Sequence, residues 1–297
     1  MHFPPHLSTG DPIALVTSSH LITEEKLQTA VHNVQSLGLE VAYTPPLRRY
    51  GYYAGTIAER VAELNDLFRS QEVRAIFFVR GGSGAASLLP ELDYPALQAR
   101  PKLLMGLSDV TAILHTVTQM TNLITYHGPV ASMQWSMSTR KQLHDLLFHP
   151  PQTYDFTLGQ HWQTVLPGQV QGQLWGGNLT VFTGLLGTPF LQRDWQHTIL
   201  FLEDIGEEHY RLDRMLSQLE LAGILPQLAG LLLGNFNHST NSSLGQFTLP
   251  EIFQRYADKL QLPTLMNAPF GHTIEQLILP IGQQASLDTR LGQLTLT

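Results

Sequence analysis

The segment Arg80–Ser87, with the sequence RGGSGAAS, follows the apolar run AIFFV and contains three glycines. Glycine lets backbone N–H groups approach a ligand closely, so this turn is suited to binding an anion or the oxyanion of a reaction intermediate. It is not a phosphate-binding loop, because no Gly-Lys-Ser/Thr follows. It is not a dinucleotide-binding loop, because Ser87 stands where Gly or Ala is required. A plain tight turn explains the local sequence equally well.

A second candidate is Ser108 in the segment LLMGLSDVTAIL, where an apolar run passes through Gly106 into a helix that begins near Asp109. A serine on a sharp strand-to-helix turn is presented at the edge of a sheet, and the helix N-terminus stabilises a developing negative charge. The hydrolase pattern Gly-x-Ser-x-Gly is not met, because Val110 occupies its last position. Taken locally, helix capping by Ser108 or Asp109 is the better interpretation.

Acidic residues follow the apolar run ILFLE, which ends at Glu203. Asp204, Glu207 and Glu208 come next, and His209 follows them. A carboxylate at a strand end can orient a histidine and stabilise its charged form, whereas a solvated loop has the same composition. A metal site has little support, because neither His-Glu-x-x-His nor another spacing of metal ligands occurs.

His272 follows a Pro-Phe-Gly turn and precedes an apolar run. A histidine can act as a general base when the fold places it beside a nucleophile. The chain contains 13 histidines, most of which we expect to be structural or exposed. His272 is therefore a candidate only in combination with the other segments.

The elements that position these residues are visible as short apolar runs separated by amphipathic segments between residues 13 and 126. The runs are IALVT, VAYT, AIFFV, LLMG and NLITY, and the helical segments include EEKLQTAVHNVQSLG and TIAERVAELNDLF. This alternation predicts a parallel sheet with helices on both faces. Ligands bind beyond the carboxyl ends of such strands, where the glycine turn and Ser108 lie.

The length of 297 residues predicts two domains. We place an N-terminal α/β domain at residues 1–150 and a linker at 151–170, where the sequence is rich in Pro, Gly and polar residues. We expect residues 171–297 to form a smaller C-terminal domain, with the strands ILFLE, GLLLGNF and QLTLT. The segment YRLDRMLSQLELAG has helical spacing and ends at Gly223.

The composition is that of a folded α/β protein and excludes several functions. A net charge of −7 without clustered Lys and Arg argues against binding to nucleic acid or a membrane surface. The absence of cysteine excludes disulfides, thiolate metal sites and a cysteine nucleophile. The N-terminal residues do not resemble a secretion signal, and no run approaches the ~18 apolar residues of a membrane span, so we expect a cytoplasmic protein.

Together these segments resemble the LD-carboxypeptidase family of serine peptidases, which includes the microcin C immunity peptidases. The resemblance extends in order over nearly the whole chain. The matching segments are GYYAGTIAERVAELNDLF, RGGSGAASLLPELDY, PKLLMGLSDVTAIL, TYHGP, WGGNLTVFTGLLGTPF, ILFLEDIGEEHYRLDRMLSQLELAG and PFGHTIEQLILPIG. Seven ordered matches are far more specific than any one motif.

The resemblance implies a catalytic triad. The family's nucleophile, the serine before Asp in a strand-to-helix turn, falls on Ser108, its acid on Glu203 and its base on His272. It also implies an oxyanion hole made by the backbone N–H groups of Gly82 and Asp109, in which the side chains of these residues take no part.

The resemblance further implies a flavodoxin-like N-terminal domain and a smaller C-terminal mixed β/α domain of the swivelling type. The implied reaction is hydrolysis of the amide between the L-centre of a diamino acid and the terminal D-alanine of a murein tetrapeptide, as in peptidoglycan recycling. It needs no metal or organic cofactor, and the family implies a homodimer.

Arg80 is a candidate for binding the terminal carboxylate, or else it pairs with Glu91 or Asp93. Leu107, Ser83 and Thr273 depart from the family's usual residues and bear on substrate fit.

Two alternatives remain open. A microcin-immunity peptidase would use the same triad to cleave an acyl-aminonucleotide amide. A non-catalytic ligand-binding module would keep the fold without activity, although the presence of Ser108, Glu203 and His272 argues against it.

Overall fold

The apolar runs of the N-terminal half form a parallel sheet in the computed structural model of the protein. The structure describes residues 1–297 except 149–153, 158–160, 192–193, 238 and 240–246. The sheet order is β12-β5-β4-β3-β1-β2, with β12 antiparallel to β5 and the other neighbours parallel. Its strands are β1 (Pro12–Val16), β2 (Glu40–Tyr43), β3 (Ala75–Phe78), β4 (Leu103–Gly106), β5 (Thr125–His127) and β12 (Leu279–Ile281).

The order of the first five strands, 2-1-3-4-5, is that of the flavodoxin-like fold and confirms the predicted class. In this order the chain reverses direction across the sheet between β1 and β3. The carboxyl ends of strands at such a reversal are the usual place for a ligand in an open α/β sheet. The segments that follow β1, β3 and β4 are therefore the ones to inspect.

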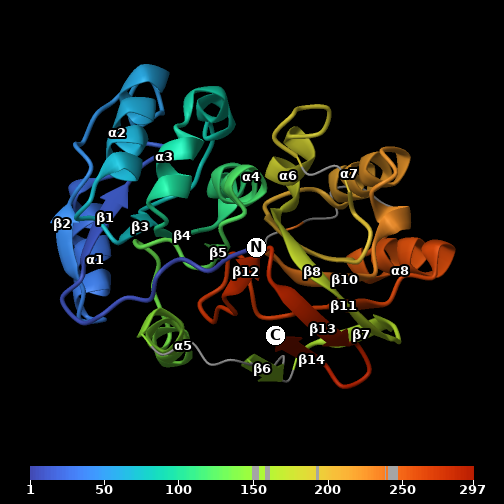
Figure 1. Ribbon diagram of the computed structural model, residues 1–297. Coiled ribbons are helices and arrows are strands. Elements are labelled where there is room, and N and C mark those ends of the chain that lie inside the picture. Colours follow the sequence, from blue (N-terminus) through green and yellow to red (C-terminus); the bar gives the residue numbers. More distant parts are fainter. Residues whose placement is uncertain (149–153, 158–160, 192–193, 238, 240–246) are drawn as a thin grey trace. The chain divides into compact units, whose positions relative to one another are not determined.

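Helices cover both faces of this sheet, as Figure 1 shows. The helices are α1 (Glu24–Gln35), α2 (Ile57–Arg69), α3 (Tyr94–Ala99), α4 (Thr111–Thr121) and α5 (Met137–Phe148), with short 3-10 turns at Ala86–Glu91 and Ser108–Val110. Helices α1 and α5 share a core with alternate strand residues such as Leu15 and Phe77, while α2, α3 and α4 lie on the other face. Helix α2 begins at a capping box between Thr56 and Glu59.

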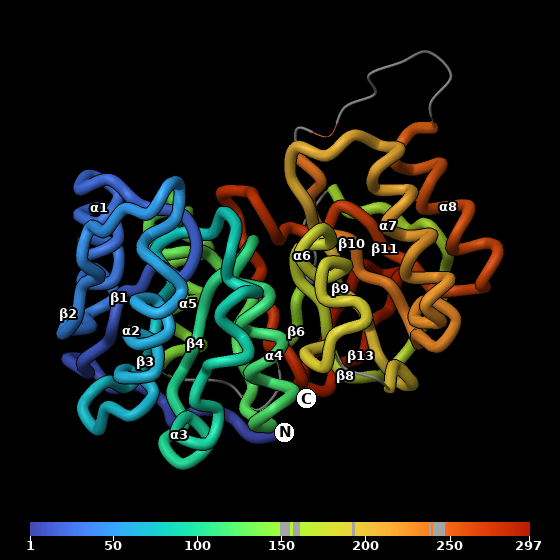
Figure 2. The backbone as a smooth tube through the Cα atoms, turned by 90° about the horizontal axis from the view of Figure 1, so that it is seen from above, coloured from blue at the N-terminus to red at the C-terminus, as the bar shows by residue number. Residues whose placement is uncertain are grey.

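A second, mixed sheet is built from the C-terminal half (Figure 2). Its order is β6-β14-β13-β8-β9-β10-β11-β7, in which β8, β9, β10 and β11 are parallel neighbours. The strands are β6 (Tyr154–Thr157), β7 (Gln163–Leu166), β8 (Gln169–Asn178), β9 (Thr198–Ile205), β10 (Gly230–Asn237), β11 (Thr264–Met266), β13 (Gln284–Asp288) and β14 (Gln293–Leu296). Its helices are α6 (Leu179–Gly184), α7 (His209–Leu221) and α8 (Leu249–Leu260), with a 3-10 turn at Leu225–Gln227.

The chain forms two compact units around these sheets. The first contains Met1–Pro151 and Ile274–Gly282, and the second contains Gln152–Thr273 and Gln283–Thr297. The segment Ile274–Gly282 belongs to the first unit because β12 pairs with β5. The prediction of 171–297 as one domain did not include this return, and the predicted linker 151–170 contains β6, β7 and the first residues of β8. Within the described part of the chain, no helix is both long and apolar enough to span a membrane.

Candidate active site

Ser108 lies on a sharp turn between β4 and α4, and its backbone φ is +65°. A non-glycine residue in the left-handed region costs about 1 kcal/mol or more, so surrounding contacts must impose this conformation. The serine begins a short 3-10 turn that leads directly into α4 at Thr111. Ser108 is partly exposed at the carboxyl edge of the sheet, and the N-cap of α4 is Val110 rather than Ser108.

The glycine turn after β3 packs directly against Ser108. A Cβ atom on Gly81 would lie 2.7 Å from Cβ and 2.8 Å from Oγ of Ser108, so no side chain fits there. Gly82 has a φ of +130°, and a Cβ atom on it would lie 2.4 Å from Cγ of His20. The structure thus brings the turn and Ser108 together, as the two motifs suggested. Among the described residues, neither the Gly82 nor the Asp109 amide donates to a protein acceptor.

Arg80 lies at the start of this turn, and its Nη1 donates to the carbonyl of Leu21 at 3.0 Å. Asp93, one of its two predicted acidic partners, instead pairs with Arg69 at 2.5 Å. No ion pair of Arg80 occurs within the described ranges of the chain. Burial lowers the pKa of His20 and the charge of Arg80 lowers it further, while the charge of Asp109 opposes that shift.

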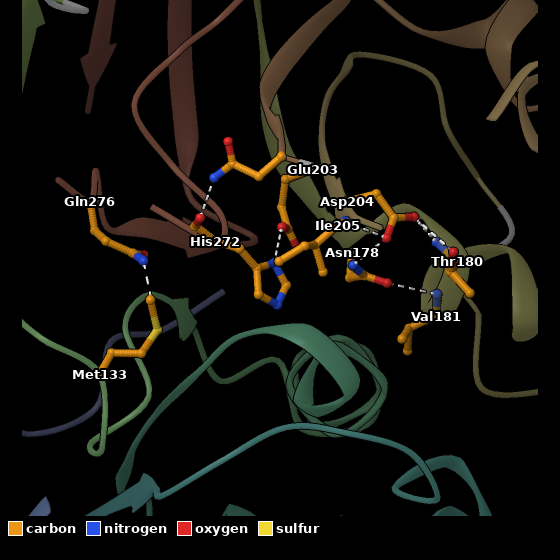
Figure 3. A network of polar contacts seen from close by, with 10 residues as sticks. Met133, Asn178, Thr180, Val181, Glu203, Asp204, Ile205, His272 and Gln276 are labelled. Atoms are coloured by element: carbon orange, nitrogen blue, oxygen red, sulfur yellow. Dashed lines mark hydrogen bonds and ion pairs between the residues drawn. The ribbon is translucent and has the colours of Figure 1, made fainter. Parts of the chain in front are cut away.

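Glu203 and His272 form a hydrogen-bonded pair in the second unit, from Nδ1 of the imidazole to Oε2 of the carboxylate at 2.7 Å (Figure 3). Glu203 is near the end of β9 and is fully buried, while the His272 side chain is 18% exposed. Gly271, with a φ of +103°, packs on the carboxylate, since a Cβ atom there would lie 2.7 Å from Oε2. The Phe-Gly-His turn therefore requires glycine, because a side chain at this position would displace the Glu203 carboxylate from His272.

The pair determines both the tautomer and the pKa of the imidazole. Because Nδ1 faces a carboxylate, Nδ1 carries a proton and Nε2 is left as the basic nitrogen. Burial lowers the pKa of His272, but its hydrogen bond to Glu203 and the charges of Glu203 and Asp204 outweigh burial and raise it above the ordinary value. The main-chain carbonyl of His272 also accepts a hydrogen bond from Asn237 Nδ2, which adds a second contact that holds the turn.

Asp204 has a structural role that the sequence did not predict. Its carboxylate is 2% exposed and accepts hydrogen bonds from Asn178 Nδ2 at 3.0 Å, from the amide and hydroxyl of Thr180 at 2.9 and 2.8 Å, and from the amide of Ile205 at 2.8 Å. Asn178 in turn caps α6 by accepting from the amide of Val181 at 3.1 Å. Asp204 thus ties the ends of β8 and β9 to the start of α6, as Figure 3 shows, and holds Glu203 in register.

The remaining acids after β9 are not part of this arrangement. Glu207 and Glu208 lie near Arg211 at 3.8 and 3.6 Å, and His209 Nδ1 contacts the carbonyl of Phe247 at 3.1 Å. No group of three or more potential metal ligands occurs in the part of the chain that the structure describes. The acidic segment therefore contains two buried carboxylates with defined partners, Glu203 and Asp204, followed by the partly exposed Glu207 and Glu208.

The two halves of the chain match known domains. Residues 13–128 match the LD-carboxypeptidase N-terminal domain, and residues 171–287 match the LD-carboxypeptidase C-terminal domain. The chain is 33% identical over 293 residues to the probable murein peptide carboxypeptidase of Bacillus subtilis strain 168, covering 96% of this chain and 91% of that protein.

Solved structures show the same similarity. One is the microcin C7 self-immunity protein MccF in complex with glutamyl sulfamoyl guanosine, with a TM-score of 0.91 and 26% identity over 98% of this chain and 97% of that one. Another is the muramoyltetrapeptide carboxypeptidase from Oxalobacter formigenes, with a TM-score of 0.86 and 28% identity over 96% of this chain and 97% of that one.

Proposed function

Because the chain belongs to the LD-carboxypeptidase family, we propose that it is a serine carboxypeptidase that removes the terminal D-alanine from murein tetrapeptides. The scissile amide joins the L-centre of a diamino acid to that D-alanine. The names of two similar proteins, a murein peptide carboxypeptidase and a muramoyltetrapeptide carboxypeptidase, support this substrate class. A cytoplasmic role in peptidoglycan recycling and a homodimeric assembly belong to the same proposal, on the family resemblance.

The observation that carries the proposal is the 2.7 Å hydrogen bond between His272 and the buried carboxylate of Glu203. It leaves Nε2 as the base and provides the negative charge that stabilises the protonated imidazole during the reaction. Ser108, on its strained turn beside Gly81, supplies the nucleophilic hydroxyl. The proposal requires Nε2 of His272 to reach Oγ of Ser108.

In the proposed reaction, Ser108 Oγ attacks the carbonyl carbon and transfers its proton to Nε2 of His272. The backbone N–H groups of Gly82 and Asp109 stabilise the oxyanion. The C–N bond then breaks, and His272 gives the proton to the leaving amine of D-alanine. Water, deprotonated by His272, attacks the acyl-enzyme and releases the tripeptide and the free serine hydroxyl.

Substrate selectivity tests the proposal. The purified protein is incubated with a murein tetrapeptide ending in D-alanine, with the same peptide ending in L-alanine, and with the tripeptide, and products are identified by mass spectrometry. We expect release of D-alanine from the first peptide only. Equal cleavage of both tetrapeptides would contradict an LD-carboxypeptidase, and absence of cleavage would reject the proposed substrate.

A second candidate function is cleavage of an acyl-aminonucleotide amide by the same triad. It is supported by the structural similarity to MccF, one structure of which holds glutamyl sulfamoyl guanosine. An aminoacyl sulfamoyl nucleoside in the same assay distinguishes the two functions. Its cleavage without cleavage of the tetrapeptide would assign the second.

A further inference from the structure

A buried arginine and a buried aspartate hold the same peptide bond in the first unit. Arg60 on α2 is 2% exposed, and Asp109, the residue after Ser108, is 6% exposed. Arg60 Nη1 donates to the carbonyl of Gly84 at 3.2 Å, while Asp109 Oδ2 accepts from the N–H of Ala85 at 2.8 Å. That carbonyl and that N–H belong to one peptide bond. Both of its polar ends are therefore held, which fixes the orientation of the peptide plane.

The same two side chains hold the segment that directly follows β1. Arg60 Nη1 donates to the carbonyl of Ser18 at 2.6 Å, and Ser19 Oγ donates to Asp109 Oδ2 at 2.5 Å. Hydrogen bonds to charged groups are stronger and more directional than neutral ones. Four such bonds thus join α2, the segment after β1, the glycine turn and the Ser108 turn.

The glycine turn is held from within as well as from outside, since Ser87 Oγ also donates to the carbonyl of Gly84, at 2.7 Å. Gly82 and Gly84 adopt φ values of +130° and +104°, and glycine retains more backbone freedom than any other residue. Packing limits this freedom on one side, since a Cβ atom on Gly84 would lie 2.4 Å from Cε1 of Tyr53. Arg60 lies over the Tyr53 ring, 4.8 Å from its centroid, so the same guanidinium also positions this packing residue.

We propose that Arg60 and Asp109 are positioning residues that set the distance between the two oxyanion donors, a role that rests on the proposed function. Asp109 bears one donor on its own backbone, and its carboxylate holds the turn that bears the other, Gly82. Arg60 holds the opposite end of the same peptide bond. In the described structure, neither side chain is hydrogen-bonded to Ser108 or His272. Burial lowers the pKa of Arg60, and the charges of Tyr53 and Asp109 oppose that shift.

The test compares the variants Asp109→Ala, which removes the acceptor but keeps the backbone N–H, and Arg60→Met with wild type by two readouts. The first is kcat and KM on the tetrapeptide, and the second is amide hydrogen exchange in residues 80–88, followed by mass spectrometry. A misplaced donor reduces the stabilisation of the transition state but not the binding of the substrate. We therefore expect kcat to fall about 100-fold with KM unchanged within about twofold. We expect amide hydrogen exchange in the glycine turn to become at least about tenfold faster. In the variants the turn can open without first breaking the hydrogen bonds to Arg60 or Asp109, so opening costs less free energy.

The matched control is Glu63→Gln. Glu63 is also a buried ionisable residue on α2, it accepts a hydrogen bond from Arg48 at 3.0 Å, and it does not contact the glycine turn in the described structure. This variant should retain wild-type kcat and wild-type exchange in residues 80–88, even where its melting temperature falls.

Three outcomes overturn the proposal or separate it from the proposed function. Unchanged exchange in both variants would show that Arg60 and Asp109 do not hold the glycine turn. Faster exchange with unchanged kcat would show that these contacts hold the turn but do not position the two oxyanion donors. Absence of wild-type turnover on both candidate substrates would instead reject the proposed function, and the exchange measurement would still decide whether Arg60 and Asp109 hold the turn.

Discussion

The contact between His272 and Glu203 decides which ring nitrogen can accept a proton, and it sets the pH at which that nitrogen is free. The carboxylate faces Nδ1 at 2.7 Å and raises the imidazole pKa against the effect of burial. The base must be neutral to act, so its activity is lost as the pH falls through this raised pKa.

Replacing Glu203 with Gln separates the two effects of the carboxylate. The variant loses the negative charge, so the pKa of His272 should fall and the acid limb of the kcat/KM profile should move to lower pH. We also expect kcat to fall by about 10⁴-fold, because the amide no longer favours the productive tautomer. A pH profile measured between pH 5 and 9 checks both effects. An acid limb that stays in place would contradict the assignment of His272 as the titrating base.

Arg80→Gln tests whether Arg80 binds the substrate carboxylate. The structure leaves the guanidinium without an ion pair among the described residues and hydrogen-bonded to Leu21. We expect KM for the tetrapeptide to rise at least about tenfold, with little change in kcat. The tetrapeptide C-terminal amide is the control substrate, and its KM should not respond to the variant. Equal effects on both substrates would show that Arg80 acts through the turn rather than on the carboxylate.

The ends of the strands position the candidate site residues, and the strands differ in how clearly the sequence predicts them. Strand β3 is readable because it is buried on both faces, which gives the run AIFFV. Strands β6 and β7 fall within the predicted linker because they lie at the two edges of the second sheet, and β7 is only partly buried, so its apolar pattern is weak. The prediction of Ser108, Glu203 and His272 as a triad rests on the ordered resemblance, since each local motif also has a plain explanation. The roles of Arg60 and the Asp109 carboxylate are not predictable from the sequence, because the groups that they hold in the glycine turn and after β1 lie 24 to 90 residues away.

Gly81→Ala tests the close approach of the glycine turn to the nucleophile. The added Cβ atom would lie 2.8 Å from Ser108 Oγ, so either the serine or the turn must move. A displacement of about 1 Å at the reacting atoms is expected to lower kcat about 100-fold. Gly184→Ala is the control, because its Cβ atom would meet no neighbour within 4 Å. Wild-type kcat in Gly81→Ala would contradict the packing described here.

On the scale of the whole molecule, the two units are not two consecutive stretches of sequence. The chain leaves the first unit after Pro151, returns to it at Ile274 and leaves it again after Gly282. The returning segment buries Leu277, Ile278, Leu279 and Ile281. Strand β12 has only three residues and contains Pro280, which is acceptable at the edge of a sheet but gives no strand signal in a sequence. The pairing of β12 with β5, about 150 residues earlier, also leaves no local trace.

The first unit should therefore depend on its distant segment for stability. A fragment of residues 1–151 lacks four buried apolar side chains, each contributing about 1.5–3 kcal/mol when fully buried. We expect this fragment to unfold at lower urea concentration than a fusion of residues 1–151 to residues 274–282 through a short flexible linker. Equal midpoints for the two proteins would contradict the assignment of Ile274–Gly282 to this unit.

The most direct test of the triad is the rate of D-alanine release by Ser108→Ala, His272→Ala and the double variant, each confirmed as folded by its melting temperature. Residues that act as one unit are strongly non-additive. We therefore predict that each single variant loses about 10³-fold or more in kcat and that the double variant loses no more than either one. Near-wild-type turnover by Ser108→Ala, or losses that multiply in the double variant, would contradict the account.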